Sequence, residues 1–179
     1  MTVLLEVNDV TKRFGGLTAV KNATFTLQKG ELTGILGPNG AGKTTLFNML
    51  TGFMAPTSGA VTFNGEAVQG LAPYKVVNRG MARTFQLCRP FVGMNLLENV
   101  LVACMSPRAH QDHDKEERAR HLLEQVGLGG RGAEPVETLP YGDLRRLEIA
   151  RALATRPDLL LLDEPFAGLG SSEIEPLAQ

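Results

Sequence analysis

Eight consecutive residues have the types and spacing needed to bind phosphate groups. The motif G-x-x-x-x-G-K-[ST] is matched at each fixed position by the run Gly37, Pro38, Asn39, Gly40, Ala41, Gly42, Lys43 and Thr44. Glycines let backbone N–H groups turn inward around phosphates, Lys43 adds a cation, and the Thr44 hydroxyl can coordinate Mg²⁺. The run therefore predicts a nucleotide site, with Lys43 near the terminal phosphates.

The residues on either side supply the context that this motif requires. Residues 31–36 are expected to form a short strand that leads into the loop, and a helix is expected from Thr45 to Leu50. The alternative is a glycine-rich turn with an accidental lysine. A full match followed by a helix is hard to reach by chance, so we favour the nucleotide site.

Two adjacent acids follow an apolar run near the end of the chain. Residues 159–162 are four leucines, which is typical of a buried parallel strand, and Asp163 and Glu164 come directly after them. Together with a phosphate-binding loop upstream, Asp163 is expected to help hold Mg²⁺ and Glu164 to orient or deprotonate the attacking water. Taken alone, the run would be an ordinary core strand that leaves into a polar loop.

Composition narrows the class of protein. The chain has 179 residues, 43% of them hydrophobic, and a formal net charge of -1, which suits one soluble globular domain and argues against a nucleic-acid partner. Residues 1–6 lack a basic signal-peptide start, and no run approaches the roughly 20 apolar residues that span a bilayer. We therefore expect the chain in the cytoplasm.

The cysteines and histidines do not have the spacing of a metal site. Cys88 and Cys104 are expected to be small buried or half-buried residues rather than a disulfide. The histidines at positions 110, 113 and 121 lie around a polar segment and a helix, so solvent exposure is favoured over zinc binding.

Local signals divide the rest of the chain into a β layer and a helical part. Alternation around Phe25 and Leu27, and the pair Asn64-Gly65 after residues 61–63, predict an antiparallel β layer. Further along, two capping pairs predict the starts of two helices: Asn95 with Glu98, and Asp114 with Glu117. The second helix carries an apolar stripe of Ala119, Leu122, Leu123 and Val126, and Gly127 predicts its end.

Residues 139–153 resemble the signature motif of ABC-type ATPases. The motif positions are held by Leu139, Pro140, Tyr141, Gly142 and Asp143. The resemblance implies that the N-terminus of the following helix meets the terminal phosphate of ATP held by a second subunit. An amphipathic helix with Leu144, Leu147 and Ala150 facing a core explains the helix too, and both interpretations can hold for it.

Other segments occur where that family would place them. Residues 83–86 resemble its Q-loop, in which Gln86 would reach Mg²⁺ or the attacking water and couple the site to a transmembrane partner. Phe14 stands where the family has an aromatic residue that stacks on adenine, although a phenylalanine in a β layer is as often core. Residues 167–169 resemble the D-loop, which meets the opposite subunit.

The resemblance implies a fold and a set of site residues. The fold is α/β, a P-loop NTPase core of ABC type with an antiparallel β layer and a helical subdomain over approximately residues 90–155, all in one nucleotide-binding domain over residues 1–179. ATP would be bound by Phe14 and residues 37–45. Lys43, Gln86 and Glu164 would be catalytic, and Thr44, Gln86 and Asp163 would bind Mg²⁺.

Four stretches of the sequence are most similar to ATPase subunits of branched-chain amino acid importers: residues 83–86, 97–100, 139–142 and 145–151. Urea or amide importers are close competitors. Such a subunit forms a homodimer or heterodimer, binds permease subunits on the inner face of the membrane, and serves a solute-binding protein indirectly. The alternatives are the ATPase of a lipid or lipopolysaccharide exporter, a non-transport ABC protein, and a catalytically idle remnant.

Three departures from the family pattern bear on activity. The usual signature is Leu-Ser-Gly-Gly-Gln, and Asp143 brings a negative charge near a partner's phosphate unless it caps the helix. Gly170 stands where the D-loop usually has Asn or Asp. The printed sequence stops at Gln179, before the family's switch histidine, so we expect a C-terminally truncated fold that binds ATP poorly and hydrolyses it slowly unless the remainder is supplied.

Overall fold

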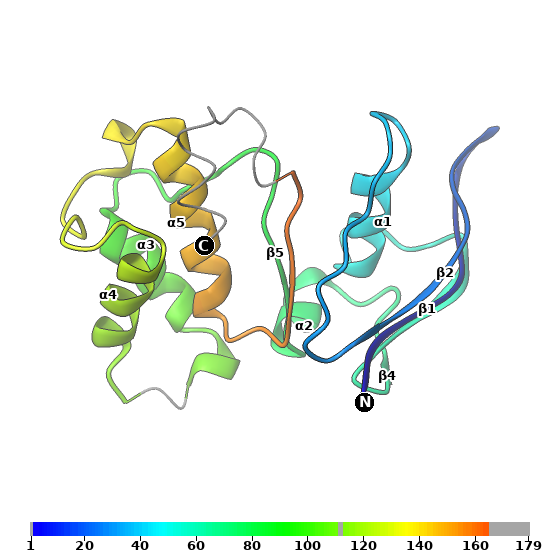
Figure 1. The fold of residues 1–179 in the computed structure, drawn as a ribbon, viewed down its shortest axis with the longest axis horizontal. Helices are drawn as coiled ribbons and strands as arrows, with labels where there is room; N and C mark the ends of the chain where they lie inside the picture. The colour runs from blue at the N-terminus through cyan, green and yellow to red at the C-terminus, as the bar shows by residue number, and fades with distance from the viewer. Residues whose placement is uncertain (1, 111–112, 165–179) are drawn as a thin grey trace. The chain divides into compact units, whose positions relative to one another are not determined.

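The computed structural model describes residues 2–110 and 113–164, which fall into two compact units that divide after Val77. Each unit is described by itself. The elements in chain order are β1 (Val3–Phe14), β2 (Leu17–Gln28), α1 (Lys43–Leu50), β3 (Ser58–Phe63), β4 (Glu66–Ala67), α2 (Pro73–Asn78), β5 (Met81–Arg83), α3 (Leu96–Cys104), η1 (Pro107–Ala109), α4 (Lys115–Gln125), η2 (Val136–Thr138), α5 (Tyr141–Ala154) and β6 (Leu159–Leu161) (Figure 1).

The first unit contains an antiparallel sheet in the order β2-β1-β3-β4, as the alternation predicts. Val7 of β1 lies opposite Phe25 of β2 and Val61 of β3, so one face of the three long strands forms a common core. Asn64 and Gly65 both have positive φ, 50° and 78°, which is the conformation of the predicted two-residue hairpin between β3 and β4.

The expected strand over residues 31–36 is wrong. These residues have no regular secondary structure, and Leu32 and Leu36 are 99% and 95% exposed. A strand needs a neighbour to accept its ladder of hydrogen bonds, and no strand that the structure describes pairs with this segment. The helix after the loop is confirmed, although it begins at Lys43, two residues earlier than expected.

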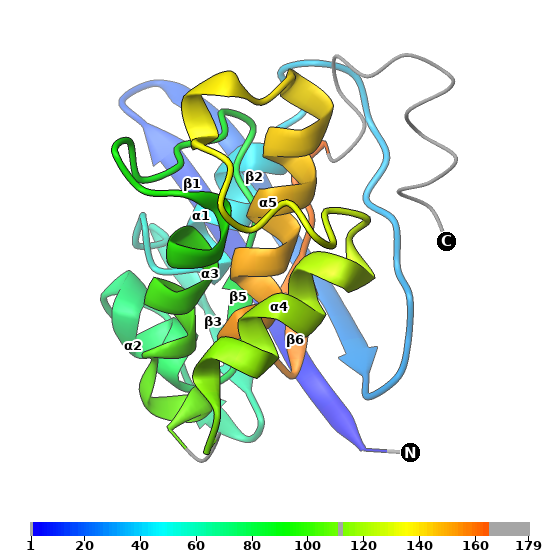
Figure 2. The same ribbon diagram turned by 90° about the vertical axis from the view of Figure 1, so that its left-hand side faces the viewer.

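Three helices of the second unit enclose one apolar core. Asn95 and Glu98 form the predicted capping box at the start of α3, and the Asp114 side chain accepts a hydrogen bond from the backbone of Glu117 at the start of α4. Gly127, with φ 76°, follows the last turn of α4, as predicted. Figures 1 and 2 show α3, α4 and α5 packed side by side, and their core includes Leu96, Val100, Leu122, Leu123, Leu147 and Ala150.

The strand before the two acids is also present. Leu159–Leu161 forms β6 and pairs in parallel with β5, with Arg83 opposite Leu161. The strand is only half-buried, contrary to expectation, because β5 is the one strand that pairs with it among the described residues. Two residues past the end of β6, Asp163 is buried, and Glu164, which follows it, is exposed.

The described residues include both cysteines and all three histidines. Cys88 is half-buried and Cys104 is buried, and neither forms a disulfide. Histidines 110, 113 and 121 are exposed, and across residues 2–110 and 113–164 no three His, Cys, Asp or Glu side chains gather as metal ligands. Within the same ranges, none of the helices is both long and apolar enough to cross a membrane.

Candidate nucleotide site

The phosphate-binding motif forms an exposed loop that ends at the first turn of α1. Gly40 and Gly42 have φ of 83° and 88°, a conformation that side chains with a Cβ rarely adopt. At Gly42 a Cβ would lie 2.3 Å from the carbonyl oxygen of Ala19 in β2, so glycine is required here for space as well. The loop can therefore take this path only because position 42 has no side chain.

The first turn of α1 has the properties of an anion site. Gly42 is the N-cap and has no side chain that could accept a hydrogen bond from the first N–H groups of the helix. The first turn also carries no acidic residue, so no carboxylate of that turn competes with a bound anion. Lys43 Nζ donates to the carbonyl oxygens of Gly37 (2.7 Å) and Pro38 (3.0 Å), which keeps the ammonium group on the loop. Thr44 and Thr45 follow in α1, half-buried. The residues present fit a bound phosphate group.

Phe14 lies at the end of β1, beside the β1–β2 turn. Its ring is 45% exposed, so it is not a core residue. Lys12 Nζ stands 5.3 Å from the ring centroid. An exposed ring at a hairpin is available to stack on a base, which is compatible with the expected contact to adenine.

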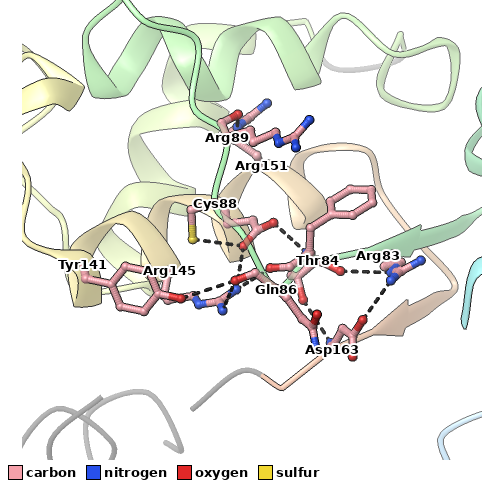
Figure 3. Close-up of polar contacts among 11 residues, drawn as sticks. Arg83, Thr84, Gln86, Cys88, Arg89, Tyr141, Arg145, Arg151 and Asp163 are labelled. Atoms are coloured by element: carbon pink, nitrogen blue, oxygen red, sulfur yellow. Dashed lines mark hydrogen bonds and ion pairs between the residues drawn. The ribbon is translucent and has the colours of Figure 1, made fainter. Parts of the chain in front are cut away.

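Asp163 is held in a buried ion pair that the sequence motifs do not reveal. Its Oδ2 lies 2.8 Å from Arg83 Nη2, and the two side chains are only 4% and 5% exposed. Its backbone N–H donates to the Thr84 hydroxyl at 3.3 Å. The pairing of β5 with β6 brings Arg83 and Thr84 to this acid (Figure 3). Glu164, by contrast, is exposed and has φ 49°.

Replacement of Arg83 by methionine is expected to lower the free energy of unfolding by about 3–5 kcal/mol, because it leaves the Asp163 carboxylate buried without its cation. Urea unfolding followed by circular dichroism measures the change. Arg120→Met is the control: it removes an exposed i,i+4 pair with Glu116 and should cost only about 0.3–0.5 kcal/mol. Equal losses in the two variants would contradict the buried pair.

Gln86 lies in the segment after β5 with an exposed side chain and an anchored backbone (Figure 3). Its carbonyl oxygen accepts hydrogen bonds from Arg145 Nη2 and, at 3.3 Å, from the Tyr141 hydroxyl. Arg145 also donates to the Phe85 carbonyl, and Glu148 Oε1 accepts from the Phe85 N–H at 2.6 Å. Sequence reasoning missed Arg145 and Glu148. The available signal was their i,i+3 spacing, which puts two opposite charges on one face of the helix.

The signature residues occupy the start of α5. Leu139 is buried, Pro140 is the N-cap without a side-chain bond, and Gly142 is buried in the first turn. Asp143 does not cap the helix. Its Oδ2 accepts a hydrogen bond from Arg131 Nη1 at 2.7 Å, and Arg131 also binds Glu134. In the structure the charge of Asp143 is therefore compensated by Arg131. The D-loop residues 167–169 and Gly170 lie outside the described residues.

Sequence comparisons agree with these motifs. A family model described as ABC transporter matches residues 20–167. The high-affinity branched-chain amino acid transport ATP-binding protein BraF of Pseudomonas aeruginosa is 43% identical, over 97% of this chain and 74% of that protein. The high-affinity branched-chain amino acid transport ATP-binding protein LivG of Escherichia coli is 41% identical, over 97% of this chain and 74% of that protein.

Solved structures agree as well. The ADP conformation of MJ1267, an ATP-binding cassette of an ABC transporter, has a TM-score of 0.87 at 30% identity and covers 98% of this chain and 74% of that one. The dimeric post-hydrolysis state of the cassette MJ0796 with ADP and Pi has a TM-score of 0.84 at 28% identity, over 97% and 79% of the two chains. The phosphate loop before α1, the helical part and these matches lead to one conclusion: the chain belongs to the ABC transporter family of ATP-binding proteins.

Proposed function

We propose that this chain is the ATP-binding and ATP-hydrolysing subunit of an ABC importer for branched-chain amino acids or related small polar solutes. The observation that carries the proposal is the loop before α1, where Gly42 lies against the backbone of Ala19 and Lys43 stays on the loop. The solute class comes from the names of the similar proteins BraF and LivG. Those names favour the importer over the lipid-exporter alternative.

Each candidate residue has a role that follows from its chemistry. Phe14 stacks on the base, and Gly37, Pro38, Asn39, Gly40, Ala41, Gly42, Lys43, Thr44 and Thr45 surround the phosphates with N–H groups and one cation. Glu164 orients the attacking water or takes its proton. Leu139, Pro140, Tyr141, Gly142 and Asp143 present the start of α5 to the nucleotide of a second subunit.

Mg²⁺ suits the oxygen donors of Thr44, Gln86 and Asp163, since hydroxyl, amide and carboxylate oxygens are its preferred ligands. When bound, the ion neutralises charge on the phosphate oxygens. Asp163 is the carboxylate among these donors, and its bond to Arg83 keeps it compensated in the structure described here.

Replacement of Lys43 by methionine tests the nucleotide site. Loss of a charge-assisted contact to phosphate should weaken ATP binding by about 10- to 100-fold. Binding is measured by equilibrium dialysis with labelled ATP. Lys29→Met is the control, because Lys29 is an exposed lysine in the turn after β2 and should leave binding unchanged. Binding that is equally strong in all three proteins would overturn the proposal.

The partners that we propose are a second ATP-binding subunit, permease subunits and, indirectly, a solute-binding protein, with no nucleic acid. The chain would then lie in the cytoplasm, at the inner face of the membrane, and its two compact units would form one nucleotide-binding domain. Exposed apolar side chains along residues 85–94 support a permease contact: Phe85, Leu87, Phe91, Val92 and Met94. Asn99 of α3 holds this segment through the backbone N–H of Phe91, at 2.8 Å.

A double replacement, Leu87→Glu with Val92→Glu, should reduce recovery of the permease with the subunit by at least about tenfold, because charges would enter an apolar interface. Both side chains are exposed, 68% and 76%, so folding should be unaffected. Recovery is measured by purification of the detergent-solubilised complex from source cells. Met105→Glu, at a side chain that is also 68% exposed but lies after α3, is the matched control. Undiminished recovery in the double variant would place the contact elsewhere.

A further inference from the structure

Two charged side chains of α5 bind the backbone of the segment that contains Gln86. Arg145 donates from Nη1 to the carbonyl of Phe85 and from Nη2 to the carbonyl of Gln86. Glu148 accepts from the Phe85 N–H at 2.6 Å and from Cys88 Sγ at 3.3 Å. Figure 3 shows that these contacts run from one helix to one short stretch of chain. Three backbone groups of two adjacent residues are thereby fixed.

Arg145 and Glu148 are both buried, and they form an ion pair with each other. The side chains of Arg145 and Glu148 are 3% and 10% exposed, and Nη1 lies 3.2 Å from Glu148 Oε2. Burying two charges is costly, and apolar residues of similar size often stabilise a fold as well or better. A planar guanidinium fork, however, can hold two carbonyls in a set geometry that an apolar side chain cannot impose. The pair is therefore better explained by positioning than by stability alone.

Contacts at both ends of α5 extend this attachment. In the first turn, the Tyr141 hydroxyl donates to the Gln86 carbonyl at 3.3 Å, and its ring lies 5.2 Å from the Arg145 guanidinium carbon. In the last turn, Arg151 donates to the Arg89 carbonyl at 2.9 Å. Residues 85–89 are thus hydrogen-bonded to α5 at several points along the helix, beginning at Tyr141 of the signature.

We propose that Arg145 and Glu148 are positioning residues for Gln86, and that they make the Gln86 backbone follow any displacement of the first turn of α5. This inference rests on the proposed function of Gln86 and of the signature. Under it, a phosphate group held against the signature turn by a partner subunit changes where Gln86 stands in this subunit. The two ATP sites of a dimer are then linked through one buried ion pair.

Labelling of Cys88 with a thiol reagent tests the attachment without nucleotide. Cys104 is fully buried, so Cys88 is the thiol that a reagent reaches first. Burial, followed by the charge of Glu148, raises the pKa of the Cys88 thiol to about 12, whereas the Arg145 charge acts in the opposite direction. Arg145→Met should therefore slow labelling if the segment stays in place. It should speed labelling by about tenfold if the segment is released, because exposure then dominates.

Two further variants keep this test decisive. Arg145→Lys retains the charge but cannot bind both carbonyls, so it should also label faster than the unmodified chain. It serves if Arg145→Met does not fold. Arg146→Met replaces the neighbouring arginine of the same helix, for which no bond to residues 85–88 is recorded in the described structure, and should label like the unmodified chain. Unchanged or slower labelling in both Arg145 variants would overturn the attachment.

Kinetics of the native subunit test the effect on Gln86. Arg145→Lys should lower kcat for ATP hydrolysis by about tenfold with little change in KM, because Gln86 is misplaced while the phosphate loop is intact. An effect on stability alone would lower the active fraction but leave kcat per folded molecule unchanged. Equal kcat in Arg145→Lys and Arg146→Met would overturn the positioning role. Absence of ATP binding in every variant, with faster Cys88 labelling in Arg145→Lys, would instead refute the proposed function and leave the attachment standing.

Discussion

Replacement of Glu164 by glutamine is expected to lower the rate of ATP hydrolysis by about 10²–10⁴-fold, which is the usual contribution of a general base. Glutamine can hold a water molecule but cannot take its proton. The side chain is exposed, and both residue types have the same Cβ at the positive φ of this position, so the fold should not change. Steady-state release of phosphate measures the rate, and ATP binding should persist.

The control for this prediction is Glu124→Gln, at an exposed carboxylate of α4. It should leave the rate unchanged. Hydrolysis that continues at the original rate in Glu164→Gln would show that another group activates the water.

Replacement of Gly42 by alanine is expected to abolish ATP binding and to lower the free energy of unfolding by about 2–5 kcal/mol. The new Cβ would stand 2.3 Å from the Ala19 carbonyl oxygen and 3.1 Å from Val20 Cγ2, and φ is 88°. Backbone atoms cannot turn aside as a flexible side chain can, so the start of α1 must move away from β2. Thermal unfolding and equilibrium dialysis measure the two effects.

Gly40→Ala separates the two causes of this loss. Gly40 has almost the same φ, 83°, but nothing lies within 4 Å of the position of its Cβ. It should cost only the roughly 1–2 kcal/mol of a left-handed alanine. If Gly40→Ala and Gly42→Ala lower stability equally, the close approach to Ala19 has no energetic effect and the prediction fails.

Features set by a few neighbouring residues could be predicted from the sequence. The capping box at Asn95, the hairpin at Asn64-Gly65 and the stop at Gly127 each depend on backbone conformations that only certain residues favour. The phosphate loop is of the same kind, since its glycines act on their own backbone. Parallel pairing of residues 159–161 followed from a run of leucines.

Features that depend on distant partners could not be predicted. Residues 31–36 have the composition of a strand, but strand formation depends on a neighbour that composition does not supply. Asp143 carries a charge whose partner, Arg131, lies twelve residues away on the other side of a loop. The sequence does not reveal a role for Arg145, because a charged helical residue is usually solvated, whereas this one is buried and binds the carbonyls of Phe85 and Gln86.

The ion pair between Arg83 and Asp163 also means that any cation that binds Asp163 must compete with the Arg83 guanidinium. The Asp163 side chain is only 4% exposed, and the Arg83 guanidinium beside it is its resident counter-ion. An incoming ion must then outcompete an arginine already bound at 2.8 Å rather than fill an unmet charge. The apparent affinity of Asp163 for a cation would then be the difference between its attraction to that cation and its attraction to Arg83. A monovalent cation would lose more from this competition than a divalent one, because its own attraction to the carboxylate is weaker. At the Mg²⁺ site that we propose for Asp163, a preference for divalent ions would therefore depend on Arg83 of the neighbouring strand β5.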